Sequence, residues 1–380
     1  MNNSKVPHRI TFATRVHHRT TRRTMSSSDD DDDAYVPYAE RPEWTDVVPI
    51  VQPESANPVV LIDYAREYVD AMNTWRAVYA SNERSERVLD LTREIIRMNG
   101  GAYTVWHHRW ELVRSLGVDL AEEMRYAGEM SRANPKNYQV WNHMRLCSQA
   151  MKHSGNANQC ELAGVLNEEN TRIALMMDAK NIHAWTQRAW AVRTFNQWES
   201  EMTFTERMID DDVRNNSAWN QRFVCVHDSP GGGGFGGEEG AKRAEAELAF
   251  AAAQLEKSRH NESAWNYIRG ILKKMPDGGW GWRGRGEAIA RKHLGDLFGT
   301  NLGTGTSKGP PGETSGGSSS GGDETPCRHA ACLLAECLLA TGEFRQAGTV
   351  FAALTHIDPV RANYHTFRRA HALGDVAPVA

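Results

Sequence analysis

The chain has 380 residues, with 44 Lys and Arg against 48 Asp and Glu, and a formal net charge of −4. This length can bury the core of one large or two ordinary domains. The near balance of charge provides no broad positive field, so we expect no nucleic-acid partner. No apolar run reaches the roughly 18 residues that a membrane helix needs, so no integral membrane segment is predicted.

The N-terminal region is basic and then acidic. The first 28 residues hold six Lys and Arg side chains and no acid, and five Asp residues follow at 29–33. We predict a disordered extension over 1–40, and an organelle transit peptide is the alternative. An extended segment is expected over 41–59. The six cysteines form no CxxC pair, which indicates reduced thiols in a cytoplasmic protein.

One phrase recurs five times, as AYTVWHHR, NYQVWNHMR, NIHAWTQR, NNSAWNQR and NESAWNYIR. Its tryptophans are Trp106, Trp141, Trp185, Trp219 and Trp265, at spacings of 35, 44, 34 and 46 residues. A period near 34 with helical patterning predicts stacked helical hairpins, with insertions in the second and fourth intervals. No segment shows the alternation of a strand. The predicted fold is therefore all-α, an α-α superhelix in which helical hairpins form a solenoid.

The start of each phrase carries a helix-capping residue. Asn stands four residues before the Trp at Asn137, Asn181, Asn215 and Asn261, and the first phrase has Ala102 there. Asn is a strong N-cap because its side chain accepts an unpaired backbone N–H. The Trp side chains are then expected to pack between hairpins, with each indole N–H bonded locally.

Other repeated positions predict packing. Between phrases, apolar stripes at helical spacing indicate second helices: Leu91, Ile95 and Met98, then Leu120, Met124, Ala127 and Met130. Three residues after their tryptophans, Arg109, Arg188 and Arg222 are expected to pair with acids on an adjacent helix. Met144 replaces this Arg in the second phrase. The histidines His107, His108 and His143 are interpreted as packing residues.

Two Gly-rich stretches interrupt the array, at 229–240 and 300–322. The predicted repeat domain covers 60–299 with a loop insertion at 229–240, followed by a disordered loop over 300–325. Helical hairpins of the same solenoid resume over 326–373, with Gly342 at a turn. The GxGxxG match at 231–236 and the DDxxD match at 29–33 lie in low-complexity sequence, and we reject both as sites.

A cation or His precedes the cap in all four capped phrases, at Lys136, Lys180, Arg214 and His260. A positive charge beside a helix N-terminus is unfavourable for helix stability. Either several hairpin ends face an anionic ligand or acidic partner, or these cations are solvated and pair with acids such as Asp178 and Asp212.

The phrases resemble the repeats of protein prenyltransferase alpha subunits. Residues 41–68 and 76–96 also resemble the start of the alpha subunit shared by protein farnesyltransferase and geranylgeranyltransferase type I. The resemblance is strong over about 40–275. It implies a crescent of hairpins around a prenyltransferase beta subunit that carries zinc. Farnesyl or geranylgeranyl diphosphate, with magnesium on the diphosphate, would then prenylate the cysteine of CaaX-motif proteins, and this chain would bind no cofactor itself.

The resemblance also assigns site residues. Lys136 stands at the family's catalytic lysine, which stabilises the departing diphosphate. Gln139 matches the glutamine that binds the CaaX carboxylate. Substrate-binding positions on the diphosphate side are matched by Tyr138, Asn181, His183 and, in the first phrase, Tyr103. Ile182 departs from the family's usual Tyr before His183. Two other functions remain open: a Rab-type geranylgeranyltransferase alpha subunit, and a non-enzymatic helical-repeat scaffold.

Overall fold

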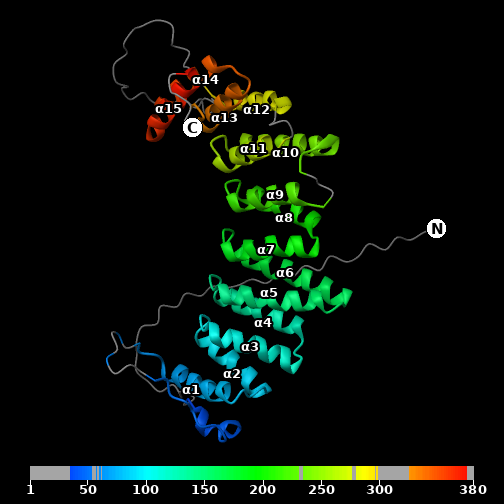
Figure 1. Cartoon of the computed structure of the whole chain (residues 1–380), viewed down its shortest axis with the longest axis vertical. Coiled ribbons are helices and arrows are strands. Elements are labelled where there is room, and N and C mark those ends of the chain that lie inside the picture. The colour runs from blue at the N-terminus through cyan, green and yellow to red at the C-terminus, as the bar shows by residue number, and fades with distance from the viewer. Residues whose placement is uncertain are drawn as a thin grey trace, which may run out of the picture. The chain divides into compact units, whose positions relative to one another are not determined.

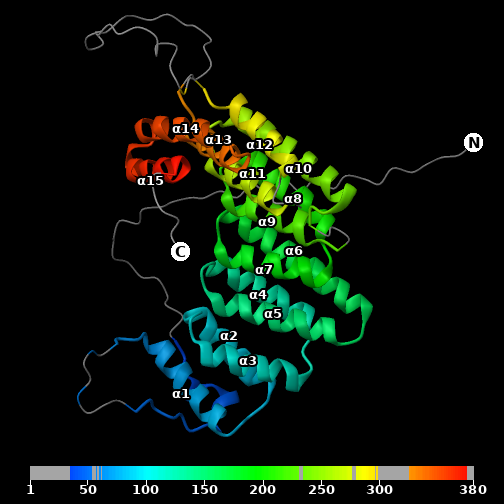
Figure 2. The same cartoon turned by 45° about the horizontal axis from the view of Figure 1, so that its top comes forward.

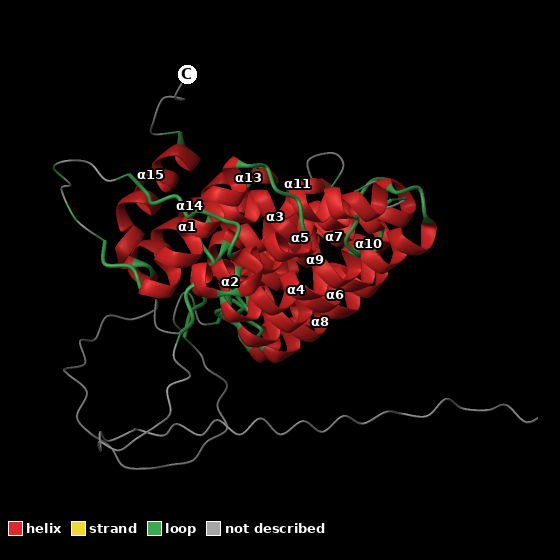
Figure 3. Cartoon of the chain, turned by 90° about the horizontal axis from the view of Figure 1, so that it is seen from below, coloured by secondary structure: helices red, strands yellow, loops and turns green. Residues whose placement is uncertain are grey.

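A computed structural model of the chain describes residues 35–53, 57, 60, 62–230, 234–275, 280–295, 297 and 325–374. All regular elements in these ranges are helices, and no strand occurs among them (Figure 3). The prediction of an all-α fold is confirmed. The chain divides into two compact units, Met1–Ala77 and Val78–Ala380. None of the described helices is long and apolar enough to cross a bilayer.

The second unit is a succession of helical hairpins stacked in chain order (Figure 1). The helices that carry the recurring phrase, here called phrase helices, are α3 (Tyr103–Leu116), α5 (Tyr138–His153), α7 (Ile182–Phe195), α9 (Asn216–Asp228) and α11 (Glu262–Lys274). The intervening helices are α2 (Glu86–Met98), α4 (Leu120–Ala133), α6 (Ala157–Met177), α8 (Trp198–Asp211), α10 (Gly237–Lys257) and α12 (Trp280–Lys292). The predicted hairpin repeat is confirmed.

The first unit folds around the start of α1 (Arg66–Ala80) and two short 3-10 helices, Tyr38–Glu40 and Pro42–Trp44. Tyr38 and Trp44 are 2% and 3% exposed and pack edge to face, with ring centroids 5.8 Å apart. The Asp70 carboxylate accepts hydrogen bonds from the Tyr35 hydroxyl (2.7 Å) and the Tyr38 backbone N–H (2.8 Å). Residues 35–40 are therefore folded, although the predicted disordered extension ran to residue 40; residues 1–34 lie outside the described ranges.

The predicted Asn caps are confirmed, and each has a second role. In every capped phrase the side-chain oxygen accepts a backbone N–H of its own helix, as Asn181 does from His183 and Ala184. The side-chain amide of the same Asn donates to a carbonyl of the preceding phrase. These donors and acceptors are Asn137 to Gly100, Asn181 to Pro135, Asn215 to Ala179 and Asn261 to Val213.

Each accepting carbonyl also receives the indole N–H of the Trp six residues further along its own phrase. Trp185 donates to Ala179 at 2.9 Å, for example, while Asn215 donates to the same oxygen at 3.0 Å. The five tryptophans all follow this pattern. We call such a carbonyl, with its Trp and the next cap, a rung. Rungs satisfy buried polar groups and link successive phrase helices, which explains why Asn and Trp recur together.

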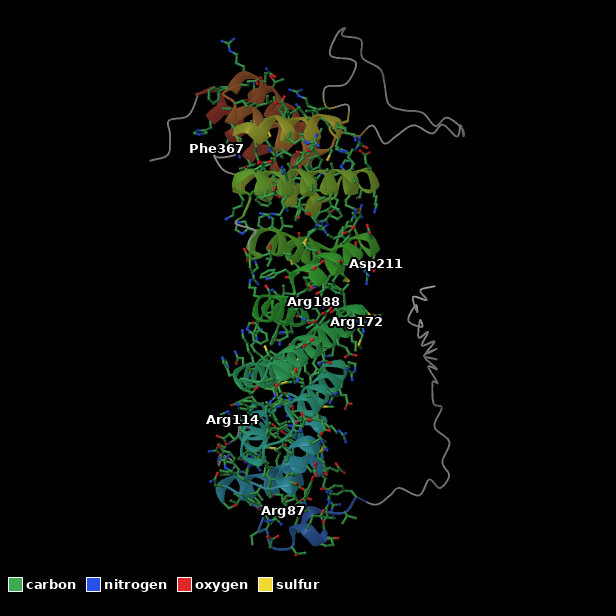
Figure 4. The ribbon with its side chains drawn as sticks, turned by 90° about the vertical axis from the view of Figure 1, so that its right-hand side faces the viewer. Arg87, Arg114, Arg172, Arg188, Asp211 and Phe367 are labelled. Carbon is green, nitrogen blue, oxygen red and sulfur yellow. The ribbon has the colours of Figure 1, made fainter. Side chains whose placement is uncertain are left out.

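The arginines after the tryptophans pair with acids as predicted, in buried layers between repeats. Arg188 bonds Glu201 at 2.7 Å, and Gln221 of the next phrase donates to the same carboxylate at 2.8 Å (Figure 4 labels Arg188 within the stack). Equivalent layers join Arg109, Glu123 and His143, and Arg222, Glu247 and Tyr267. The arginine and the glutamate of each layer form a buried ion pair, so their charges do not face a ligand.

The layer formed by the second phrase carries no charge. Met144 takes the place of the Arg, and Asn167 on α6 takes the place of the Glu. Gln187 donates to Asn167 at 2.7 Å, and Asn167 donates to Ser148 at 2.9 Å. The Arg and its acid are replaced together, so the layer stays satisfied without an unpaired buried charge.

The insertions lengthen the intervening helices. α6 and α10 have 21 residues each, whereas α4 and α8 have 14. The predicted loop over 229–240 is too long, because Gly237–Gly240 opens α10 and Phe235 is 1% exposed. The buried Phe235 side chain is an apolar contact that the glycine content of this stretch does not predict.

Two packing predictions are also wrong. Met98 is 43% exposed, and the His107 side chain lies at the surface near Glu111.

The described chain ends with α13 (Arg328–Ala340), α14 (Phe344–Ile357) and α15 (Ala362–Leu373), beside α11 and α12 (Figure 2). Gly342, at φ +82°, makes the expected turn between α13 and α14. Cys327 precedes α13 at the position of a cap, and its thiol donates to the Arg259 carbonyl at 3.3 Å. The last rung thus uses Cys where the others use Asn. Residues 300–324 lie outside the described ranges.

Candidate functional site

The site begins at the N-terminus of α5. Asn137 caps this helix by accepting the backbone N–H of Gln139 at 2.9 Å. Lys136, the residue before the cap, is exposed and makes no hydrogen bond or ion pair with the described part of the chain. The first backbone N–H groups of α5 and the helix dipole favour an anion at this point, and the Lys136 ammonium adds a full positive charge.

A groove follows from this helix start between α5 and α7. It has a volume of about 160 Å³ and is lined by Tyr138, Trp141, Asn142, Arg145, His183, Thr186 and Gln187. The structure therefore brings together Tyr138 and His183, two of the predicted site residues, from different hairpins. Neither side chain has a hydrogen-bond partner in the described residues, so both remain available to a ligand.

Asn181, which the resemblance assigns to substrate binding, forms hydrogen bonds within the protein. It is 3% exposed, its oxygen caps α7, and its amide donates to the Pro135 carbonyl at 2.9 Å. All its polar atoms are therefore engaged by the protein. Because Pro135 directly precedes Lys136, Asn181 fixes the backbone from which the lysine extends.

The other positions singled out in the sequence lie in the first turns of phrase helices. Gln139, also in the first turn of α5, is half-buried, and its side-chain amide is unpaired in the described structure. Tyr103 opens α3 in the preceding phrase and is 64% exposed. Ile182 opens α7 and is 72% exposed, so an apolar side chain faces outward beside His183. Neither Tyr103 nor Ile182 lines the groove.

The cations before the caps differ in their surroundings. Lys180 forms an ion pair with Asp212 at 3.2 Å, as one alternative from the sequence held. The Arg214 guanidinium reaches Ser258 at 3.4 Å, and His260 also has an interaction within the protein. Lys136 alone of these four has none among the described residues. Of these four charges, the one on Lys136 is therefore not engaged within the described part of the chain.

Nucleophilic and metal-binding groups are not gathered at this site. The described residues contain no group of three or more His, Cys, Asp or Glu side chains that could hold a metal ion. The nearest buried thiol in α5, Cys147, has its pKa raised well above the ordinary value by burial. The first turn of α5, with Lys136 beside it, favours the binding of negative charge.

Sequence reasoning missed Arg145 and Gln187. Arg145 lies seven residues after Tyr138, so both project from the same face of α5. This spacing was a usable signal for Arg145. The part played by Gln187 depends on how α7 packs on α5, which the sequence does not show.

Comparison with known proteins gives the following matches. Residues 85–116, 120–151, 169–195, 198–228 and 244–275 match the protein prenyltransferase alpha subunit repeat. The "Protein farnesyltransferase/geranylgeranyltransferase type-1 subunit alpha" of Pisum sativum is 40% identical over 238 residues, covering 63% of this chain and 68% of the relative. Its namesake in Dictyostelium discoideum is 37% identical over 198 residues, covering 50% and 59%.

Two further matches are more distant in sequence. The "Geranylgeranyl transferase type-2 subunit alpha" of Bos taurus is 27% identical over 166 residues, covering 40% of this chain and 28% of the relative. Among solved structures, "Candida albicans protein geranylgeranyltransferase-I complexed with GGPP" aligns with a TM-score of 0.71 and 23% identity. That alignment covers 90% of this chain and all of the other.

Proposed function

Because the chain belongs to the protein prenyltransferase alpha subunit family, we propose that it is the alpha subunit of a heterodimeric protein farnesyltransferase and geranylgeranyltransferase type 1. The enzyme would transfer a farnesyl or geranylgeranyl group from its diphosphate to the cysteine of a C-terminal CaaX motif. The observation that carries the site assignment is the free Lys136 ammonium beside a helix start, next to the groove that holds Tyr138 and His183.

Lys136 would act on the leaving group. In prenyl transfer the substrate thiolate forms a bond to C1 of the isoprenoid, the C1–O bond breaks, and both bonding electrons leave with the diphosphate. Negative charge on the diphosphate therefore grows in the transition state. A preplaced ammonium at the N-terminus of α5 stabilises that charge more than it stabilises the bound substrate, which lowers the barrier.

The other residues would hold the substrates. Tyr138 and His183 present unpaired polar atoms in the groove beside the diphosphate, and Gln139 offers its amide to the CaaX carboxylate. Asn181 would act as a positioning residue, since its amide fixes Pro135 just before Lys136. Tyr103, on the neighbouring phrase helix, would contribute from the edge of this region.

The partner is proposed to be a prenyltransferase beta subunit. The described residues of this chain do not offer a metal site, so we place the zinc that activates the substrate thiol in the beta subunit, with magnesium on the diphosphate. We expect the heterodimer in the cytoplasm, where reduced thiols persist; the six cysteines form no disulfide in the structure.

Co-expression with candidate beta subunits tests the proposal. We expect a stable heterodimer that contains zinc and transfers farnesyl or geranylgeranyl to a short CaaX peptide, with neither chain active alone. Transfer without an escort protein would argue against a Rab-type alpha subunit. A chain that copurifies only with non-catalytic acidic proteins, and supports no transfer, would overturn the proposal in favour of a scaffold.

A further inference from the structure

The groove between α5 and α7 contains an arginine, Arg145, that has no acidic partner among the described residues. Arg145 is half-buried, and its Nε donates to the Gln187 side-chain oxygen at 3.1 Å. Its guanidinium lies over the Trp190 ring, 5.0 Å from the centroid. Nη1 and Nη2 have no hydrogen-bond partner among the described residues. The side chain is thus anchored on one edge and on one face, with its remaining donors free.

The uncharged layer makes this anchoring possible. In the three charged layers, the residue two after the Trp donates to a glutamate: His143, Gln221 and Tyr267 do so. Gln187 occupies the same position, but its partner on the intervening helix is Asn167. Its amide donates to Asn167, and its side-chain oxygen turns to Arg145. Because this layer has no glutamate, the Gln187 side-chain oxygen is held where it accepts a hydrogen bond from Arg145 in the groove.

The arginine at the equivalent repeat position in α11, Arg269, binds a carboxylate of the chain itself. Arg269 stands four residues after Trp265, as Arg145 stands four after Trp141. The Nε of Arg269 donates to the Glu336 carboxylate on α13 at 3.2 Å. In α13, Ala331 occupies the position that Trp185 holds in α7. Glu336 lies five residues after Ala331, and Trp190 lies five residues after Trp185, so Glu336 and Trp190 are equivalent. The chain supplies a carboxylate to Arg269 and an aromatic face to Arg145.

The proposed function assigns its two anions to other positions on α5. Arg145 is seven residues beyond Tyr138, about 10 Å along the helix from the start where Lys136 would meet the diphosphate. Gln139, assigned to the CaaX carboxylate, is rotated by about 120° around α5 from Arg145. The Nη1 and Nη2 donors of Arg145 are thus open to a third anion, and their planar fork matches a carboxylate.

We propose that Arg145 binds an Asp or Glu carboxylate of the partner subunit, inserted into the groove between α5 and α7, and that Gln187 positions the guanidinium for it. This rests on the proposed function, because the partner is the zinc-bearing subunit named there. A desolvated charge pair of this kind slows dissociation of a complex more than it speeds association.

The test uses the assembled heterodimer. Dissociation is measured by exchange of a labelled alpha chain against excess unlabelled chain. Arg145→Gln should raise the dissociation rate about 10²-fold, and Arg145→Lys, which keeps the charge and loses the fork, about tenfold. Arg172→Gln is the matched control, because Arg172 is exposed on the intervening helix α6 (labelled in Figure 4) and should leave the rate unchanged. Added salt should change the ratio of the wild-type and Arg145→Gln dissociation rates little, because a desolvated charge pair is screened weakly.

The outcomes separate this inference from the function it rests on. A wild-type chain that forms no heterodimer overturns the proposed function. A wild-type heterodimer that dissociates no more slowly than Arg145→Gln overturns the inference alone. An unchanged dissociation rate with weakened binding of the prenyl diphosphate would instead assign Arg145 to the diphosphate. Thermal melting of the free chains identifies a misfolded Arg145→Gln, in which case the result with Arg145→Lys decides.

Discussion

Lys136 and Lys180 occupy the same position in successive repeats, yet only Lys180 has an acidic partner, Asp212. We therefore expect Lys136→Ala to lower kcat for prenyl transfer by about 10²-fold, the scale of removing one preorganised charge stabiliser. Binding of the prenyl diphosphate should change less, because the charge develops mainly in the transition state. Steady-state and single-turnover kinetics of the heterodimer measure both effects.

Lys180→Ala is the control for this prediction, since it removes a lysine from the same repeat position and helix geometry. Its kcat should stay within about twofold of wild type, because an exposed ion pair contributes little. Equal losses from the two substitutions would show a general electrostatic effect. An unchanged kcat in Lys136→Ala would remove this lysine from the mechanism.

Glu123 makes a buried layer sensitive to acid. Burial alone would raise the pKa of this carboxyl, but hydrogen bonds from His143 and Arg109 lower its pKa to about 2. A folded-state pKa below the unfolded value contributes stability above about pH 4.3, which is lost as the pH falls toward 2. A shift of about two units corresponds to roughly 3 kcal/mol at neutral pH.

Glu123→Gln should remove this pH dependence. Wild type should be more stable than the variant at pH 6, and the difference in unfolding free energy should narrow by about 2 kcal/mol at pH 3. Urea denaturation of the free chain at both pH values measures the two differences. Parallel losses of stability in wild type and variant would show that Glu123 is already protonated, or does not titrate, across this range.

At the scale of single elements, the cap asparagines are under two constraints. Asn and Asp cap helices about equally well, because each offers a side-chain oxygen. In a rung, however, the second atom must donate, as Asn215 does to the Ala179 carbonyl at 3.0 Å. Asn215→Asp would place a carboxylate oxygen against that carbonyl, and Asn215 is fully buried.

We expect Asn215→Asp to lower the unfolding free energy by about 2 kcal/mol or more, the cost of an unsatisfied buried pair. Asn156→Asp is the matched control. Asn156 caps α6 through the backbone N–H groups of Asn158 and Gln159, and it is exposed with no link to another repeat. Asn156→Asp should change the unfolding free energy by no more than about 0.5 kcal/mol. Similar effects at the two sites, in urea denaturation, would contradict the double role.

Periodicity and capping chemistry are local, and the sequence predicts them well. Each cap stands four residues before its Trp and each paired Arg three residues after it, and the whole phrase recurs every 34 to 46 residues. The rung carbonyls, such as Ala179, leave no trace in a side chain, so no pattern could identify them. Exposure of Met98 and His107 depends on which helices pack beside α2 and α3. Phe235 is 1% exposed, so a Gly-rich sequence can still contribute a side chain to the core.

The site was predictable only in part. Lys136, Tyr138 and Gln139 could be placed at a helix start from the cap alone, and the family resemblance gave them roles. That Tyr138 and His183 share one groove, and that Asn181 is engaged within the protein, required the packing of α5 against α7. Arg269 has a carboxylate partner within the chain, Glu336, and Arg145 has none among the described residues. Repeat spacing alone does not show which of two equivalent arginines has a partner.

At the scale of the whole second unit, each hairpin contacts mainly its neighbours, so local changes should propagate weakly. The last rung, where a thiol stands in for an amide, tests this. Cys327→Asn supplies a stronger donor to the Arg259 carbonyl and a side-chain cap for α13, which has none. We expect a gain of about 1 kcal/mol in the stability of α13–α15.

Hydrogen exchange resolves where that gain appears. Amides of α13–α15 should exchange more slowly in Cys327→Asn, while those of α3–α5 keep their wild-type rates. Faster exchange in α13 would mean that the larger side chain disrupts this fully buried position. A uniform change along the chain would contradict nearest-neighbour coupling.

The two 21-residue intervening helices have a practical consequence. The phrase helices keep 13 to 16 residues and their rungs, while α6 and α10 are longer than α4 and α8, at 21 residues against 14. Asn156, just before α6, is exposed and bonds to no other hairpin. An affinity tag or fluorescent reporter inserted between His153 and Asn156 should therefore leave enzyme assembly intact, and would allow the heterodimer to be immobilised or followed in living cells.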